Sequence, residues 1–295
     1  MENVFKSGFV SVIGRANVGK STLINSLVGE KISIVSDKPQ TTRYNALGIY
    51  HGEDVQIIFT DTPGIHKPKN KLGEHMVKSV TSSLNEVDAV LLVVDGGRDI
   101  SEVERNITAN LKETNTPVVL AINKIDLLKK EALLPIIANY STLYPFSAIV
   151  PISAKKNDGV SSILTELAQF LPEGPKFYPD DMITDQPERQ IIAEIIREKL
   201  LWMLNEEVPH GIAIEVLQME NKPGIVNVSA NIFCEKQSHK GIIIGKNGEL
   251  LKKIGTISRE EMEKRLNKKV YLQLWVRVKE NWRNNNYLMK NLGFE

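Results

Sequence analysis

Gly14-Arg15-Ala16-Asn17-Val18-Gly19-Lys20-Ser21 is the stretch of the sequence that decides the fold of the N-terminal half. It follows a short apolar run and precedes a helical pattern, the context in which G-x-x-x-x-G-K-[ST] predicts a phosphate-binding loop. Its glycines let the loop close, so that backbone N–H groups and the helix N-terminus point at phosphates. We expect Lys20 to reach the terminal phosphates and the Ser21 hydroxyl to ligate Mg²⁺. The alternative is a glycine-rich turn that merely precedes a helix.

Short apolar runs alternate with amphipathic stretches from Phe9 to Phe170. This alternation is typical of a wound α/β domain, in which crossover helices join the strands of a mostly parallel sheet. We expect strands at Phe9 to Ile13, Ile57 to Phe59, Ala89 to Val94, Val118 to Ile122 and Ile149 to Ile152. We expect helices at Ser21 to Val28, Lys71 to Leu84, Ser101 to Glu113, Ala132 to Tyr140 and Val160 to Phe170.

Three further motifs stand where expected strands end, which is where ligands collect in parallel sheets. Asp61-Thr62-Pro63-Gly64 offers a carboxylate that can hold Mg²⁺ through water and a glycine N–H for the terminal phosphate. Asn123-Lys124-Ile125-Asp126 offers a carboxylate for the N1–H and amine of guanine, and adenine lacks these donors. Ser153-Ala154-Lys155 can add a backbone N–H for the guanine oxygen. Each motif alone fits a plain turn or helix start, but their order favours a guanine-nucleotide site.

In these motifs the chain resembles the translation-factor-like GTPases and, within them, the Era family. The resemblance implies that Gln40-Thr41-Thr42-Arg43 is the first switch segment, with Thr42 rather than Thr41 as the Mg²⁺ ligand. It implies a second switch from Asp61 to about Gly73. There Ile65 replaces the water-orienting glutamine of Ras-like proteins, so slow intrinsic hydrolysis is expected. Asn17 occupies a position that helps hold K⁺ in some relatives, so stimulation by K⁺ is a hypothesis.

The motifs and the resemblance together predict three overlapping sets of residues around the nucleotide. Those expected to contact GTP are Gly14, Arg15, Ala16, Asn17, Val18, Gly19, Lys20, Ser21, Thr22, Asp61, Thr62, Pro63, Gly64, Ile65, Asn123, Lys124, Ile125, Asp126, Ser153, Ala154 and Lys155. Those expected to hold Mg²⁺ are Ser21, Thr42 and Asp61. Those expected to act in catalysis are Lys20, Thr42, Asp61 and Gly64.

The pattern changes after Leu171-Pro172-Glu173-Gly174-Pro175, where two prolines and a glycine end a helix. The acidic stretch up to Pro187 predicts a linker. From about Glu188 to Val278 we expect the order helix, strand, strand, helix, helix, strand, with Asn221 to Gly224 as the turn of an antiparallel pair. The predicted organisation is a GTPase domain at residues 1–173, a linker at 174–187, a second domain at 188–280 and a tail at 281–295.

The turn Gly245-Lys246-Asn247-Gly248 joins the last two expected helices. A G-x-x-G turn in this setting resembles the loop of the KH module, and the element order is that of an α+β, type II KH domain. The last sixty residues hold 14 basic and 6 acidic side chains, which suits a polyanion-binding face, although a solvated basic face gives part of the same count. Residues expected to bind RNA are Gly245, Lys246, Asn247, Gly248, Lys240, Lys252 and Lys253.

Tyr271, Trp275 and Arg277 are expected on either the helix-covered or the solvent side of the last strand, and packing is favoured over base stacking for both aromatic residues. The tail from Asn281 to Glu295 fits a closing helix, a further RNA contact or a peripheral membrane foot.

Composition excludes several classes of protein. The 295 residues are 42% hydrophobic and 25% charged, with 37 basic and 36 acidic side chains, as in an ordinary globular protein. Cys234 is the single cysteine, so an internal disulfide is excluded and a reducing cytosolic compartment fits best. No apolar run approaches the roughly 20 residues that span a bilayer, so any membrane contact is expected to be peripheral.

The Era resemblance covers nearly the whole chain. It implies a monomeric, cytoplasmic switch that binds GTP and GDP with Mg²⁺ and hydrolyses GTP. It also implies as partners the 3′ end of small-subunit (16S) ribosomal RNA and the small-subunit precursor, with peripheral contact to the cytoplasmic face of the cell membrane. Two alternatives stay open. One is a GTPase that acts on a protein or membrane partner, with the KH-like domain purely structural. The other is a P-loop kinase for a small molecule, against which the base-selecting motifs argue.

Overall fold

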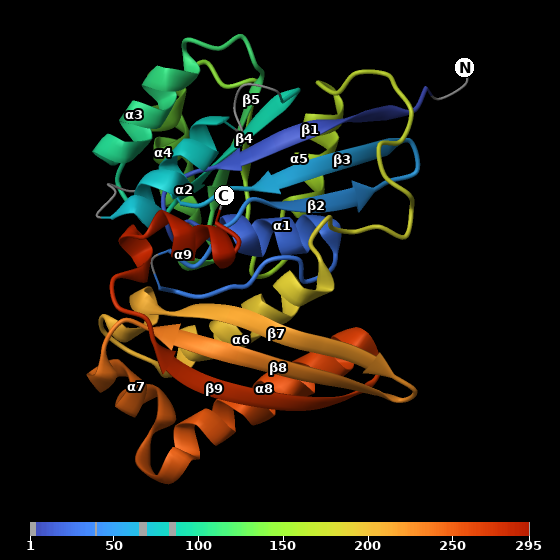
Figure 1. The fold of residues 1–295 in the computed structure, drawn as a ribbon. Helices are drawn as coiled ribbons and strands as arrows, with labels where there is room; N and C mark the ends of the chain where they lie inside the picture. Colours follow the sequence, from blue (N-terminus) through green and yellow to red (C-terminus); the bar gives the residue numbers. More distant parts are fainter. Residues whose placement is uncertain (1–3, 39, 65–69, 83–86, 295) are drawn as a thin grey trace. The chain divides into compact units, whose positions relative to one another are not determined.

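The computed structural model describes residues 4–38, 40–64, 70–82 and 87–294. The chain divides into two compact units (Figure 1). The first contains the described residues of 1–35, 42–67 and 76–185, and the second contains those of 36–41, 68–75 and 186–295.

The first unit is built on a six-stranded sheet in the order β2-β3-β1-β4-β5-β6 (Figure 1). Its strands are β1 (Lys6–Ile13), β2 (Ala46–His51), β3 (Val55–Asp61), β4 (Ala89–Asp95), β5 (Val118–Asn123) and β6 (Ala148–Pro151). All neighbouring strands pair in parallel except β2, which runs antiparallel to β3. The expected wound, mostly parallel sheet is therefore confirmed.

Strand β2 is the one strand of this sheet that the apolar-run pattern misses. It lies at the edge of the sheet and has strand β3 as its neighbour in the strand order. An antiparallel edge strand need not be apolar throughout, so it gives a weak sequence signal. Gly48 also interrupts its apolar residues, and a Cβ there would lie 2.8 Å from Cγ2 of Ile24. The glycine allows β2 to pack closely against the helix that follows the phosphate-binding loop.

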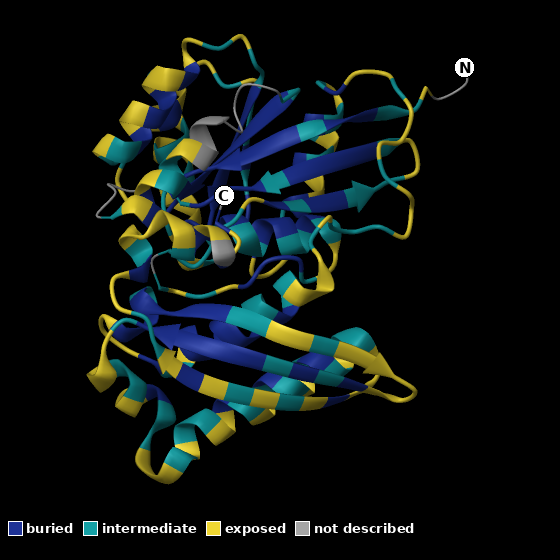
Figure 2. Ribbon diagram, viewed as in Figure 1, coloured by how far each residue is buried: buried dark blue, intermediate teal, exposed yellow. Residues whose placement is uncertain are grey.

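Helices cover both faces of the six-stranded sheet. They are α1 (Lys20–Val28), α2 (Lys71–Ser82), α3 (Glu102–Leu111), α4 (Lys130–Leu143) and α5 (Val160–Ala168). Apolar residues of α1 and α5 share one buried cluster with β1, β3 and β4, and those of α3 and α4 share another. Every residue of β4 is buried, as Figure 2 shows for the centre of this sheet. The strand ends that carry the predicted site therefore belong to a sheet whose central strand β4 is fully buried.

The second unit has a three-stranded sheet in the order β7-β8-β9. Its elements are α6 (Glu188–Met203), β7 (Ala213–Lys222), β8 (Ile225–Cys234), α7 (Gln237–Ile244), α8 (Glu249–Leu266), β9 (Lys269–Val278) and α9 (Asn286–Asn291). β7 and β8 form an antiparallel hairpin, whereas β9 returns parallel to β8 after α7 and α8. One face of the sheet packs on α6 and α8 around a single apolar cluster. The order expected for a type II KH domain is confirmed.

Short 3₁₀ turns complete the chain at η1 (Ile125–Leu127), η2 (Val208–Gly211), η3 (Lys246–Gly248) and η4 (Trp282–Asn284). The tail closes the second unit, because Trp282 is fully buried and its Nε1 donates to the carbonyl of Gly211 at 2.9 Å. The ring of Phe294 stacks on Trp282 with 5.8 Å between centroids. Of the three roles considered for the tail, a closing helix is the one these contacts describe.

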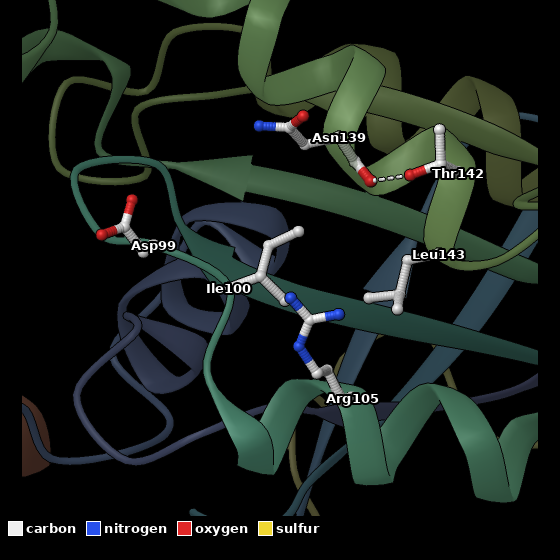
Figure 3. A pocket seen from close by; sticks show the side chains of 6 residues that line it. All are labelled: Asp99, Ile100, Arg105, Asn139, Thr142 and Leu143. Atoms are coloured by element: carbon white, nitrogen blue, oxygen red, sulfur yellow. Dashed lines mark hydrogen bonds between the residues drawn. The ribbon is translucent and has the colours of Figure 1, made fainter.

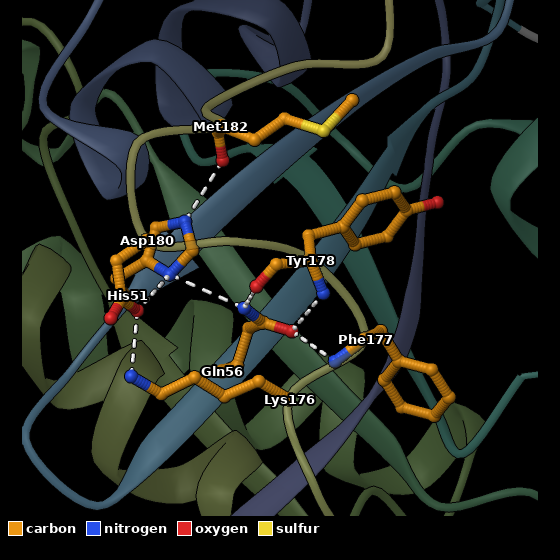
Figure 4. Close-up of polar contacts among 7 residues, drawn as sticks. All are labelled: His51, Gln56, Lys176, Phe177, Tyr178, Asp180 and Met182. Carbon is orange, nitrogen blue, oxygen red and sulfur yellow. Dashed lines mark hydrogen bonds and ion pairs between the residues drawn. The ribbon is translucent and has the colours of Figure 1, made fainter.

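The expected linker is held against the first unit as far as Asp185. The main-chain N–H of Ile49 on β2 donates to the carbonyl of Ile183 at 2.9 Å, and Leu47 N donates to the Asp185 carboxylate at 3.1 Å. Gln56 on β3 binds the main chain of Phe177 and Tyr178 (Figure 4). These residues therefore cover the edge of the sheet at β2.

Candidate functional site

The predicted phosphate-binding loop leads from β1 into α1. Lys20 is buried, and its Nζ donates to the carbonyls of Gly14 at 3.1 Å and Arg15 at 3.3 Å. Burial lowers the pKa of this lysine to about 8, although the nearby charge of Asp61 acts in the opposite direction. A buried ammonium held by carbonyls favours an anionic ligand, because phosphate oxygens would restore its lost solvation.

Two glycines of this loop are required by close contacts. Gly14 has φ +150°, and a Cβ on it would lie 2.3 Å from the carbonyl oxygen of Val93. Gly19 has φ +102°, and a Cβ on it would lie 2.3 Å from Nδ2 of Asn123. The loop therefore packs directly on β4 and on the side chain at the end of β5, which brings separate motifs to one edge of the sheet.

The Asp61 to Gly64 motif packs on the same loop. Asp61 and Thr62 are fully buried, and the Thr62 hydroxyl donates to the carbonyl of Val12 at 2.7 Å. A Cβ on Gly64 would lie 2.6 Å from Cα of Ala16. This close approach places the Gly64 main chain beside the phosphate-binding loop, as expected for a group that contacts the terminal phosphate.

The predicted Mg²⁺ ligands come together at the start of α1. The hydroxyls of Ser21 and Thr42 are 2.8 Å apart. Two neighbouring ligands of one octahedral Mg²⁺ lie about 3.0 Å apart, because each Mg–O bond is about 2.1 Å. The hydroxyl of Thr41 instead donates to the carbonyl of Lys38 at 2.6 Å. The pair Ser21 and Thr42 therefore fits Mg²⁺, with the buried Asp61 carboxylate beside Lys20 as the nearby negative charge.

Asn123 ties three motifs together. Its Nδ2 donates to the carbonyl of Val18 at 2.8 Å, and its Oδ1 accepts from the N–H groups of Lys124 at 2.8 Å and Ala154 at 3.0 Å. The phosphate-binding loop, the segment after β5 and the segment after β6 are thus joined by one buried side chain. In this arrangement Asn123 positions the nucleotide site by holding its loops together.

Asp126 presents the carboxylate expected to select guanine. Its Oδ1 accepts a hydrogen bond from the Ser153 hydroxyl at 2.7 Å. That hydrogen bond is the largest cause of a lowered pKa for Asp126. The carboxylate is therefore held ionised and fixed in orientation, as recognition of the two guanine donors requires. The N–H of Ala154 binds Asn123, so in this arrangement it is not directed at a base oxygen.

Sequence reasoning missed Asp95, which lies buried at the end of β4. Its Oδ2 accepts from Nζ of Lys124 at 2.8 Å, and Lys124 also donates to the carbonyl of Asn17 at 2.8 Å. Asp95 therefore fixes the lysine that braces the phosphate-binding loop. An acidic residue directly after a fully apolar run was the available signal.

The other predicted nucleotide contacts vary in exposure. Asn17 and Lys155 are exposed, Pro63 and Val18 are buried, and Ala16, Thr22 and Ile125 are intermediate. Ile65 lies outside the described residues.

The Gly245 to Gly248 turn has the backbone geometry of an open loop. Gly245, Asn247 and Gly248 all have positive φ, at 73°, 52° and 79°. A Cβ on Gly245 would lie 2.7 Å from Cβ of Leu250, whereas a Cβ on Gly248 would meet no atom within 4 Å. One glycine is needed for packing and the other leaves open space, where a nucleic-acid backbone can approach the main chain. The predicted basic residues Lys246, Lys252 and Lys253 are exposed, and Lys240 is intermediate.

Of the two sides considered for Tyr271 and Trp275, the structure places both on the solvent side of β9, so the favoured packing role is wrong. Tyr271 is 53% exposed and Trp275 is 41% exposed. Both lie on the face of β9 that does not contribute to the apolar cluster of the second unit. The reason is the register of β9, because the alternate positions Leu272, Leu274 and Val276 fill that cluster.

A pocket of about 400 Å³ lies elsewhere on the first unit, beside α3 and α4 (Figure 3). Its lining is Asp99, Ile100, Arg105, Asn139, Thr142 and Leu143. None of these residues belongs to the nucleotide motifs, and nothing in the pocket indicates a ligand. Among the described residues, no helix combines the length and apolar character needed to cross a bilayer.

Comparison with known proteins agrees with this geometry in both units. A family model described as 50S ribosome-binding GTPase matches residues 9–124, and a KH domain model matches residues 207–283. The chain is 53% identical over 292 residues to GTPase Era of Ruminiclostridium cellulolyticum, covering 99% of this chain and 98% of that protein. It is 54% identical over 294 residues to GTPase Era of Clostridioides difficile, covering 99% of each.

Two solved structures extend the match to three dimensions. One is a crystal structure of Era in complex with MgGDPNP and nucleotides 1506–1542 of 16S ribosomal RNA, with a TM-score of 0.96 and 39% identity over 98% of this chain and 99% of that one. The other is a single-residue variant of Aquifex aeolicus Era bound to GDP.AlF4⁻, with a TM-score of 0.95 and 39% identity over 98% of this chain and 99% of that one. With both units and the full length matched, the chain belongs to the Era family of GTPases.

Proposed function

We propose that this GTPase is a switch whose KH domain binds the 3′ end of small-subunit ribosomal RNA during assembly of that subunit. The observation that carries the proposal is the presence, in one chain, of a nucleotide site with a guanine-selecting carboxylate and a G-x-x-G loop with open space beside Gly248. The related Era bound to MgGDPNP and 16S ribosomal RNA supports both halves of it.

Different residues of the first unit bind the phosphates, the Mg²⁺ ion and the guanine base. Main-chain N–H groups of Gly14 to Ser21 and the ammonium of Lys20 bind the phosphates. The hydroxyls of Ser21 and Thr42 hold Mg²⁺, which when bound offsets charge on the phosphate oxygens. Asp126 orients the guanine. Because Ile65 has no group that can position water, hydrolysis without a partner is slow and K⁺ is the proposed stimulating ion, with Asn17 beside it.

In the second unit, the loop from Gly245 to Gly248 binds the RNA backbone at the main chain, and its basic neighbours neutralise phosphates. Those neighbours are Lys240, Lys246, Lys252 and Lys253.

We place the KH domain at residues 188–280, after a GTPase domain at 1–173 and the connecting residues 174–187. GTP binding acts on the switch segments 36–43 and 61–73, of which residues 39 and 65–69 lie outside the described residues, and hydrolysis acts as the release step. The protein works in the cytoplasm as a monomer, in part at the inner face of the membrane.

The test is RNA binding by the full chain, with an oligonucleotide that matches the 3′ end of small-subunit ribosomal RNA and a scrambled one of equal length. Each is measured with a non-hydrolysable GTP analogue and with GDP. Tighter binding of the matching RNA in the GTP-like state is expected, with a steep dependence on salt. Equal weak binding of both RNAs in both states would contradict the proposal and favour a protein or membrane partner.

A further inference from the structure

The outer face of the KH sheet is open along β9. Tyr271, Gln273, Trp275 and Arg277 are all exposed, and they alternate with residues that pack on the helices of the second unit (Figure 2). Side chains at every second position of a strand lie on one face. The four residues therefore form a single row, here called the β9 row, on the side of the sheet away from α6 and α8.

Two aromatic rings in this row are spaced for separate bases. Tyr271 and Trp275 are 53% and 41% exposed, which leaves much of each ring in contact with solvent. They are four residues apart, which corresponds to about 13 Å along an extended strand. Exposed aromatic side chains on an open sheet are the feature on which single-stranded RNA stacks its bases, and such stacking tolerates any base sequence.

The polar neighbours of the rings form an ordered layer on β8 and β9. Nε of Arg277 donates to Oδ1 of Asn231 at 2.9 Å, and Nδ2 of Asn231 donates to the Glu215 carboxylate at 2.9 Å. Nε2 of Gln273 donates to the Tyr271 hydroxyl at 3.1 Å. Asn227 and Asn231 pair in register with Tyr271 and Trp275. Asn231 is buried, and both polar groups of its amide are engaged in these two hydrogen bonds. Arg277 is thereby held beside Trp275, where it can bind a phosphate.

The charges on this face favour an anionic partner. Strands β8 and β9 contain no acidic residue, and β9 contributes Lys269 and Arg277. On β7, Glu215 is engaged by Asn231, and Glu220 lies 3.3 Å from Nζ of Lys222. A protein partner would also accept exposed aromatics and arginine, but the lack of acidic residues on the two strands that carry the rings favours RNA.

The β9 row is also continuous with the proposed loop site. Strand β8 ends at Cys234, opposite Val278 of β9, and the chain then enters α7, which ends at the Gly245 loop. α7 packs against β9 within the same unit. An RNA strand leaving the loop can therefore pass over α7, where Lys236 is exposed, and reach the end of the sheet that carries Arg277 and Trp275.

We propose that the β9 row is a second RNA-binding surface, on which the single-stranded RNA held at the Gly245 loop continues and stacks two bases on Tyr271 and Trp275. This inference rests on the proposed function, because it adds a surface for the same RNA. It predicts that long RNA binds more tightly than the loop alone allows, without added sequence preference along the sheet.

The test compares two RNAs from the 3′ end of small-subunit ribosomal RNA on the full chain. One has about 5 nucleotides, enough for the loop, and the other has about 20, enough to reach the sheet as well. Tyr271→Ala and Trp275→Ala are each expected to weaken binding of the long RNA about 5-fold or more and to leave the short RNA unchanged. Tyr287→Ala is the matched control, because Tyr287 is 73% exposed on α9, outside the row.

Tryptophan fluorescence gives a second measurement in which both Tyr271 and Trp275 are kept. The chain has three tryptophans, of which Trp282 is fully buried, so Trp202→Phe leaves Trp275 as the exposed one. Stacking of a base is expected to quench its fluorescence with the long RNA and not with the short one. Absence of quenching would overturn the proposal.

The outcomes separate this inference from the proposed function. If Gly248→Asp abolishes RNA binding but the two ring variants bind long RNA like the unmodified chain, the β9 row serves another partner class and the proposal is wrong. If the ring variants weaken both RNAs equally, the rings have no separate site and the proposal is also wrong. If the unmodified chain binds neither RNA, the proposed function fails and the β9 row fails with it.

Discussion

The side chain of Gln56 forms hydrogen bonds with both main-chain polar groups of Tyr178, the N–H and the carbonyl. Oε1 accepts from the Tyr178 N–H at 3.1 Å, and Nε2 donates to the Tyr178 carbonyl at 2.7 Å (Figure 4). Oε1 also accepts from the N–H of Phe177 at 2.7 Å. Gln56 is fully buried. One side chain on β3 therefore fastens the segment that connects the GTPase domain to the rest of the chain.

Gln56→Ala is expected to lower the free energy of unfolding by about 2 kcal/mol or more, because three main-chain groups lose their partner. It should also increase proteolytic cleavage within residues 174–185. Denaturant unfolding and limited proteolysis measure the two effects. Gln218→Ala is the control, since Gln218 is exposed on β7 and should change stability by less than about 0.5 kcal/mol. Equal stability of both variants would show that the segment is held by other contacts.

Lys20 makes nucleotide affinity depend on pH. Its pKa in the nucleotide-free protein is about 8, below the ordinary value of 10.5. Phosphate binding favours the ammonium form, so the contribution of Lys20 to affinity should be constant below pH 8 and fall as pH rises above it, with proton uptake by this group on binding. The unfolded state binds more protons between pH 8 and 10.5, so this group makes the free protein relatively more stable as pH rises over that range. Calorimetry of GDP binding in buffers of different ionisation enthalpy counts the protons. No uptake at about pH 9 would contradict this assignment.

Gly64→Ala tests the close approach of two motifs. The new Cβ would lie 2.6 Å from Cα of Ala16, and main chain cannot yield as a flexible side chain does. The Gly64 N–H would be displaced from the expected position of the terminal phosphate, so we expect the rate of GTP hydrolysis to fall at least about 10-fold. The affinity for GDP should change less, because GDP lacks that phosphate. Gly241→Ala is the control, because a Cβ there meets no atom within 4 Å. Single-turnover phosphate release measures both, and similar rates would exclude this role.

Asp126→Asn should change which base is bound. The carboxylate accepts from two guanine donors, whereas an amide meets one of them with its own N–H group. Xanthine has a carbonyl in place of the guanine amine, so it matches the amide better. We expect GDP affinity to fall at least about 100-fold and xanthosine diphosphate to bind more tightly than GDP. Competition binding measures the ratio, and unchanged preference for GDP would remove Asp126 from base selection.

Sequence reasoning reached the motifs because each one is local, and it missed contacts that depend on the third dimension. Lys20, Ser21 and Asp126 follow from spacing and strand ends. The role of Asn123 as a tie between Val18 and Ala154 follows only from packing of three loops.

The register of β9 shows the same limit. The alternation of apolar and other residues from Val270 to Val278 is visible in the sequence. Tyr271 and Trp275 remain exposed because the helices pack on the other face of the sheet, and the sequence pattern does not show which face that is. The connecting residues 174–185 look like a linker for the same reason, because a buried glutamine on a distant strand leaves no mark on their composition.

Gly248→Asp tests the RNA loop against a matched glycine. Gly248 has φ +79° and open space around its Cα, so aspartate adds modest strain and places a carboxylate where RNA phosphates approach. Gly224 in the β7–β8 turn has φ +76° and equally open surroundings, so Gly224→Asp carries the same strain and charge outside the loop.

We expect Gly248→Asp to weaken binding of the ribosomal RNA 3′ end at least about 10-fold while GTP hydrolysis stays unchanged, and Gly224→Asp to alter neither. Fluorescence anisotropy with labelled RNA and phosphate release measure the pair. An equal loss of RNA affinity in the two variants would mean that a negative charge added anywhere on the KH domain is enough to weaken RNA binding. The loop would then have no special role. A loss confined to Gly248→Asp assigns the contact to the main chain of that turn, because charge and backbone strain are the same in the control.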